Sequence, residues 1–158
     1  MSLLAFFQWC EQSGIGAAIR RSSWLFPVIE AIHLLGLGMI GGAVLVVDMR
    51  LLGLGLRRQS LAQLARDAQR WLIGSLIVMI ITGTLLFLSE AIKCYYHAAF
   101  WMKMASLFLA IVFTFTVQRK VTRAEEARMS PVWSKVVALV SVALWSGVGI
   151  GGRWIGFS

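Results

Sequence analysis

The sequence predicts an all-α integral membrane protein, a four-helix bundle preceded by an amphipathic helix, and three observations support this fold class. Of the 158 residues, 59% are hydrophobic and only 14% are charged, whereas soluble domains are about 45–50% apolar and about 25% charged. Four apolar runs approach the roughly 20 residues that a helix needs to cross a bilayer. Their even spacing argues against the short alternating strands of a membrane barrel, and backbone groups in lipid must then bond within helices.

The N-terminal stretch is expected to lie on the bilayer as one amphipathic helix over residues 1–23. It does not resemble a signal peptide, because it lacks a basic start and polar residues interrupt its apolar run. We expect Leu4, Phe7 and Trp9 to face lipid.

The four apolar runs form a single membrane domain, residues 1–158. The segment SLAQLARDAQRW carries apolar residues at a helical period, so it is expected to extend the second span at the membrane surface. Pro131 suits the first turn of the fourth helix. The predicted spans cover about 26–47, 71–89, 99–117 and 135–155.

The basic residues predict the orientation. The net charge is +8, but the cations fall between apolar runs, which indicates loops facing an anionic leaflet and no nucleic-acid partner. By the positive-inside rule, the loops after spans one and three are cytoplasmic, and both termini are periplasmic in a bacterial inner membrane. Those loops hold Arg50, Arg57, Arg58, Arg66, Arg70, Arg119, Lys120, Arg123, Arg128 and Lys135, against Arg20, Arg21, Lys93 and Arg153 on the other side.

Ionisable and aromatic residues gather in the outer half of the predicted bundle. At about 1.5 Å per residue, His33 lies roughly 10 Å inside the start of span one. Ionisable groups at such depth are costly and indicate function by default. The alternatives are an ion pair of Glu30 with Arg153 or Lys103, a histidine that only packs, and a lysine that extends to the interface. The candidate pocket comprises Glu30, His33, His97, Trp101, Lys103 and Arg153.

Three chemistries could use this pocket. Haem b requires an axial imidazole between apolar helices. His33 is the best candidate ligand and His97 a second, with Glu30 or Lys103 orienting a ligand or meeting a propionate. A proton relay through Glu30 and His33 is another possibility.

Copper is the third chemistry. A thiol, an imidazole and two thioethers suit Cu(I), and the candidates are Cys94, His97, Met102 and Met104. Met102 and Met104 lie roughly 200° apart on a helix, so both cannot face one ion.

Other motifs predict packing. There is no Walker loop, dinucleotide fingerprint or HExxH motif. Gly38-x-x-x-Gly42 is expected to form a close helix-packing face. The small residues of spans one and four permit tight helix contacts, within the chain or between subunits, and these are Gly36, Gly38, Gly41, Gly42, Gly147, Gly149, Gly151 and Gly152. Cys10 and Cys94 both fall on the outer side, where a disulfide is possible, although two free thiols are favoured.

Three segments carry a family resemblance: FFQWCEQSGIGAAIRRSSWLFPVIEAIHLLGLGMIGGAVLVVDMRLLGLG, AFWMKMASL and WSGVGIGGRWIGF. They resemble a family of small bacterial four-span proteins of unknown function, DUF6644. More distantly, the histidine of span one and the lysine of span three are similar to HemJ-type protoporphyrinogen oxidases and CopD-type copper-resistance domains. That similarity implies that His33 is a haem ligand and that Lys103 is the span-three lysine.

The sequence therefore favours a b-type haem-binding redox or electron-transfer subunit around His33. A copper or small-solute carrier and a membrane scaffold subunit are the alternatives. The expected partners are the lipid bilayer, a larger redox or transport complex, or further copies of the chain.

Overall fold

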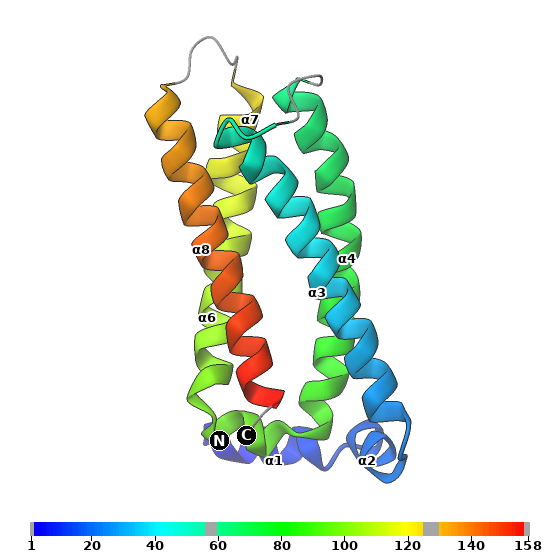
Figure 1. The fold of residues 1–158 in the computed structure, drawn as a ribbon. Coiled ribbons are helices and arrows are strands. Elements are labelled where there is room, and N and C mark those ends of the chain that lie inside the picture. Colours follow the sequence, from blue (N-terminus) through cyan, green and yellow to red (C-terminus); the bar gives the residue numbers. More distant parts are fainter. Residues whose placement is uncertain (1, 56–59, 125–129, 157–158) are drawn as a thin grey trace.

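The computed structural model describes residues 2–55, 60–124 and 130–156, and every regular element in these ranges is a helix. Within these ranges, four helices are long and apolar enough to cross a membrane. They stand side by side, with α1 (Leu3–Glu11), α2 (Gly14–Arg21) and α5 (Ala91–Tyr96) gathered at one end, here called the outer end (Figure 1). The opposite end, where α4 begins and α7 ends, is called the loop end. The predicted all-α four-helix fold is confirmed.

The four spans extend beyond the apolar runs because their polar ends continue the helices. The amphipathic segment before span two starts α4, as expected, and Ser60 caps that helix by accepting a hydrogen bond from the Gln63 amide. Pro131 is the first residue of α8. The spans are α3 (Leu25–Leu51), α4 (Leu61–Ser89), a third span made of α6 (Ala98–Phe113), the π-helix η1 (Thr114–Gln118) and α7 (Arg119–Arg123), and α8 (Pro131–Gly156).

The N-terminal segment forms two helices where one was predicted. These are α1 (Leu3–Glu11) and α2 (Gly14–Arg21). Ser13 separates them, and its hydroxyl accepts a hydrogen bond from the Gly16 amide and caps α2. The chain therefore bends at Ser13, so that α1 and α2 follow different directions across the outer end (Figure 1).

The prediction that Phe7 faces lipid is wrong. Phe7 is only 5% exposed, whereas Trp9 is 70% exposed. The Phe7 ring packs edge-on against Phe87 of α4, with ring centroids 5.2 Å apart. Because α1 lies across the end of the bundle, its buried face contacts the protein and only its other face is available to lipid.

The predicted close packing of glycines is confirmed at some positions and fails at others. A Cβ at Gly38 or Gly42 would meet nothing within 4 Å, so the face predicted there does not form within the chain. At Gly36 a Cβ would lie 3.3 Å from Met79 Cγ, where α3 approaches α4. At Gly151 it would lie 3.2 Å from the Cβ of the α6 lysine, where α8 approaches α6.

The bundle is not closed all round. Helix α3 packs along α4 and α8, and α8 packs along α6, whereas α4 and α6 share no extensive interface. The gap between α4 and the third span holds two cavities, one in the outer half and one at the loop end.

Candidate functional site

The cavity in the outer half, here called the outer groove, has a volume of about 490 Å³. Helices α4 and α6 form its two sides, α3 supplies its floor and α1 covers its outer end. Its walls are mostly apolar, as in typical small-molecule sites. The residues that matter for its chemistry are His33, Phe87, Phe100, Trp101, Lys103 and Met104.

His33 lies on the floor with its two ring nitrogens in different environments. Its Nδ1 is 2.8 Å from Thr82 Oγ1. The Thr82 hydroxyl has one proton and donates it to the Val78 carbonyl at 2.7 Å. His33 Nδ1 must therefore be the donor to Thr82, which leaves Nε2 with its lone pair free to accept a hydrogen bond or bind a metal.

Lys103 of α6 is the partner of that lone pair. Its Nζ lies 3.4 Å from His33 Nε2 and donates toward it. Two glycines of α8 make room for the lysine: a Cβ at Gly152 would lie 3.3 Å from Nζ. Within the described ranges no carboxylate forms an ion pair with Lys103, so its amino group is positioned by an imidazole and a close backbone surface.

Gly83 positions the imidazole from the other side. A Cβ at this residue would lie only 3.1 Å from His33 Cε1. The ring is 8% exposed, and Thr82 holds its Nδ1. Besides the bond from Lys103, His33 is therefore fixed by one hydrogen bond and one close packing contact from adjacent residues of α4.

An aromatic cluster closes the outer end of the groove. Phe7 contacts Trp101 with ring centroids 6.0 Å apart, and Phe87 stacks on Phe100 at 5.9 Å. The Trp101 indole is itself fixed, because its Nε1 donates to the Tyr95 carbonyl at 3.1 Å. The outer groove is thus walled by rings whose positions are set by mutual packing.

Two charged residues fasten the N-terminal helices over this cluster. Arg20 of α2 donates to the Ser89 carbonyl at 2.8 Å and to the Glu11 carbonyl at 2.7 Å. The Glu11 carboxylate accepts a hydrogen bond from the Ile92 amide at 2.6 Å, at the start of α5 (Ala91–Tyr96). These bonds join α1, α2, α4 and α5 into one cover.

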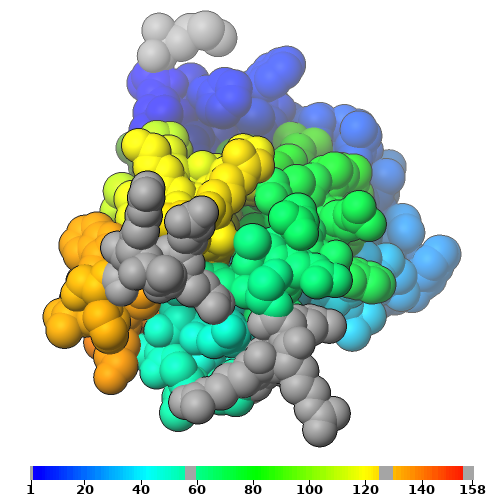
Figure 2. Space-filling view, turned by 90° about the horizontal axis from the view of Figure 1, so that it is seen from above, coloured from blue at the N-terminus to red at the C-terminus, as the bar shows by residue number. Residues whose placement is uncertain are grey.

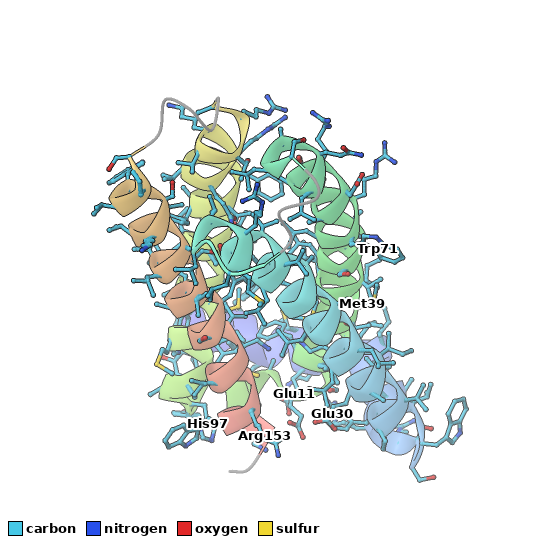
Figure 3. The ribbon with its side chains drawn as sticks, turned by 45° about the horizontal axis from the view of Figure 1, so that its top comes forward. Glu11, Glu30, Met39, Trp71, His97 and Arg153 are labelled. Atoms are coloured by element: carbon cyan, nitrogen blue, oxygen red, sulfur yellow. The ribbon has the colours of Figure 1, made fainter. Side chains whose placement is uncertain are left out.

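The structure brings three of the six predicted site residues into the outer groove, namely His33, Trp101 and Lys103. Glu30, His97 and Arg153 also lie at the outer end, but none of them lines the groove (Figure 3). Glu30 forms no ion pair with Lys103 in the described part of the chain, so the structural ion pair considered for those two residues is not present.

Of the four copper ligands predicted around Cys94, Met104 lines the outer groove, and the other three are not among its described lining residues. Within the described residues no group of three or more His, Cys, Asp or Glu side chains could hold a metal ion. Met104 lines the outer groove, whereas Met102 does not and is exposed. The assignment of His97 as a second metal ligand stays a prediction.

Cys10 and Cys94 are both free and buried, and both belong to the apolar cluster between α1 and α5. Burial raises the pKa of the Cys94 thiol to about 11, and the neighbouring Glu90 carboxylate contributes in the same direction. The Cys94 thiol therefore stays protonated at neutral pH and acts as a packing group.

Sequence reasoning missed Thr82 and Gly83. The available signal was the stretch Thr-Gly-Thr at residues 82–84, which interrupts the apolar run of span two with small and polar residues. Nothing local relates this break to a histidine 49 positions earlier.

Comparison with known proteins adds one finding. The sequence model of the family DUF6644, a family of unknown function, matches residues 6–158, which is nearly the whole chain. No curated protein and no solved structure matches the chain.

Proposed function

The chain belongs to the DUF6644 family, for which no function is described, and from the outer groove we propose that it binds haem b as a redox or electron-transfer subunit of a bacterial inner membrane. The observation that carries this proposal is the state of His33: Nδ1 is held by Thr82, and Nε2 presents its lone pair at the floor of an apolar groove. When bound, the haem iron would supply one-electron chemistry.

The residues of the groove fit this group. Metal-ligating histidines almost always donate their other ring N–H to a fixed partner, which sets the tautomer and the ring orientation. Thr82 plays that part for His33. The rings of Phe87, Phe100 and Trp101 offer apolar walls for a flat macrocycle, and the cavity of about 490 Å³ is within the range of small-molecule sites.

Lys103 supports the same assignment through its charge. It approaches His33 Nε2 at 3.4 Å and has no carboxylate partner within the described ranges. A cation in an apolar groove is costly unless paired, and haem carries two propionate carboxylates. We assign Lys103 to a propionate, which requires its long side chain to turn away from His33 and so free Nε2 for iron.

The proposal is tested by the visible spectrum of the protein purified after haem-replete expression. The wild-type chain should show a Soret band, which His33→Ala should abolish. His97→Ala tests the second predicted ligand: we expect this variant to keep the band, because His97 does not line the groove, and a lost band would assign His97 to the iron as well. A colourless wild-type protein, or a band that survives His33→Ala, would refute the assignment.

Copper transport is a second candidate because of one observation. Met79 and Met104 line the same groove as His33, and an imidazole with two thioethers suits Cu(I). Copper at one ion per chain that is lost in Met79→Leu and Met104→Leu, with no Soret band, would replace the haem assignment. If neither group is bound and the chain co-purifies with a larger enzyme or with further copies of itself, the scaffold function is favoured.

The proposed orientation has a separate test. Helix α1 and the end of α8 share the outer end, and the ends of α3 and α7 share the other (Figure 1). Arg57, Arg58 and Arg128, which contribute to the charge bias, lie outside the described residues. A C-terminal alkaline phosphatase fusion should be active and a fusion after Leu54 inactive, whereas the reverse would invert the topology.

A further inference from the structure

A second cavity lies at the loop end of the same gap between α4 and the third span. Its volume is about 320 Å³. Three arginines from two sides of the gap line it, Arg66 from α4 and Arg119 and Arg123 from α7. Figure 2 looks onto this end, where the segment that includes α7 (yellow) lies beside the start of α4 (green). We call this cavity the arginine pocket.

Every charged residue among the described lining of the arginine pocket is an arginine. No aspartate or glutamate of the described ranges lines it. None of its three arginines forms an ion pair with a residue that the structure describes. Gln69 and Thr122 add neutral hydrogen-bonding groups beside the guanidinium groups. Guanidinium groups bind phosphate oxygens with paired N–H donors, so this lining suits an anion with several oxygens.

The inner wall of the arginine pocket is apolar. Val44, Leu72 and Phe115 line it deeper in the bundle than the arginines, and Ala65 adds apolar surface beside Arg66. A free anion gains no binding energy from an apolar wall. A phospholipid carries both a phosphate and acyl chains, so it can contact the arginines and the apolar wall together. The joint presence of cations at the helix ends and apolar surface toward the membrane interior therefore favours a lipid over a soluble anion.

The third span is irregular where it forms this wall. Thr114 and Gln118 line the pocket and bound the π-helical segment η1, the only such segment in the described residues. Single π-helical turns inside α-helices occur frequently at functional sites. Gln118 is held from behind, because its amide donates to Asp48 at 2.8 Å.

We propose that the arginine pocket binds the phosphate headgroup of an anionic phospholipid, with Arg66, Arg119 and Arg123 on the phosphate and the acyl chains along the apolar inner wall. The site is independent of the haem assignment, since it shares no lining residue with the outer groove.

The test measures lipid binding to the purified full chain by native mass spectrometry. The probes are phosphatidylglycerol, phosphatidylcholine and inorganic phosphate. The combined variant Arg66→Gln, Arg119→Gln, Arg123→Gln should weaken phosphatidylglycerol binding by at least about tenfold, since each cation near a membrane surface contributes measurably to anionic-lipid affinity. Phosphatidylcholine should bind more weakly than phosphatidylglycerol, and the variant should remove that preference.

A charge-matched control separates the pocket from the general positive field. Arg70→Gln, Lys120→Gln, Lys135→Gln removes the same charge from residues that do not line the arginine pocket, and it should change affinity by less than about twofold. Equal losses in both triple variants, or no loss in the first, would overturn the proposal. Inorganic phosphate that binds the wild type and displaces the lipid would show that the site takes the free anion.

A second variant guards against a misfolded triple mutant. Ala65→Leu fills part of the apolar wall and leaves every charge in place. It should also reduce phosphatidylglycerol binding, because the acyl chains lose their surface. Unchanged binding in Ala65→Leu would contradict the placement of the lipid.

Discussion

The outer groove and the arginine pocket occupy the same gap between α4 and the third span, yet different kinds of side chain line them. The outer groove contains one imidazole and one amine among aromatic rings. The arginine pocket has three guanidinium groups and two amide side chains around a smaller cavity. The gap between α4 and the third span thus offers a site for a large apolar ligand near one end and a site for an anion near the other.

The difference lies in how the polar groups are held. In the outer groove, Thr82 fixes His33 by a hydrogen bond and Gly83 by close packing. In the arginine pocket, Arg66, Arg119 and Arg123 are exposed and form no ion pair with a described residue. Coordination of a metal requires a fixed donor, whereas attraction of an anion tolerates flexible cations. Positional precision therefore distinguishes the two sites more than polarity does.

The largest expected effect concerns Gln118, which links the arginine pocket to the core. Gln118→Leu should lower the free energy of unfolding by about 1–3 kcal/mol, because it removes the donor from Asp48 Oδ1. Asp48 is fully buried, and its Oδ2 accepts no hydrogen bond from the residues described. Denaturant titration in detergent measures the change. Gln69→Leu, in the same pocket without this bond, is the control; equal stabilities of the two variants would contradict the argument.

A smaller effect is expected at Thr82 and should be confined to the outer groove. Thr82→Val removes the acceptor of the His33 Nδ1–H bond. Loss of such an outer partner typically lowers metal affinity by about 10–100-fold, and we expect the lower end of this range. Haem titration followed by absorbance measures it.

Thr116→Val is the matched control for that measurement. Thr116 makes the same type of bond as Thr82, from its hydroxyl to a backbone carbonyl four residues earlier, and it lines neither site. Equal haem affinity in the two variants would break the link between Thr82 and His33. Phosphatidylglycerol binding should be unchanged in both variants, and a loss there would mean that the two sites are coupled.

Two glycines of α4 provide the next comparison. At Gly74 a Cβ meets nothing within 4 Å, so Gly74→Ala should stabilise the helix by up to about 1 kcal/mol. At Gly83 a Cβ would lie 3.1 Å from His33 Cε1, so Gly83→Ala should lose that gain and displace the imidazole. Thermal unfolding of both variants tests the difference. A Gly83→Ala protein as stable as Gly74→Ala would show that the ring has room.

The smallest effect concerns pH. The folded pKa of Cys94, about 11, exceeds its ordinary value of 9.0. A raised pKa favours the folded state while the thiol is protonated, so this contribution is complete below pH 9 and is lost as the pH rises toward 11. In a Cys10→Ser background, alkylation of the native protein should therefore lag behind that of the unfolded chain across this interval. Coincident pH profiles would refute the burial argument.

The spans could be predicted from the sequence because the bilayer sets helix length directly. Even the extension of α4 was visible in the apolar period before Trp71. The helix faces were less accessible. Phe7 was assigned to lipid because an amphipathic pattern does not say whether its apolar face meets lipid or protein. Of the glycines assigned to packing on span one, Gly36 makes a close contact within the chain, whereas Gly38 and Gly42 do not.

The candidate site could also be predicted only in part, because the sequence shows which residues are polar but not how each helix is rotated. His33 and Lys103 were identified because a polar residue in an apolar run is conspicuous, and both line the outer groove. Glu30 and Arg153 are equally conspicuous but lie outside it, since the rotation of a helix about its axis depends on packing between helices. Thr82 escaped notice because a hydroxyl in a membrane helix is commonplace until its partner is known.

The outer groove opens on the side that faces away from α3. Ile80 and Met104, on opposite sides of the opening, are 55% and 44% exposed, while Phe7 closes the way from the end of the bundle. An occupant would arrive sideways, out of the hydrocarbon phase. Its occupancy would then follow its partition coefficient and its abundance in the membrane, and delivery in micelles or vesicles would succeed where an aqueous solution of the same compound fails.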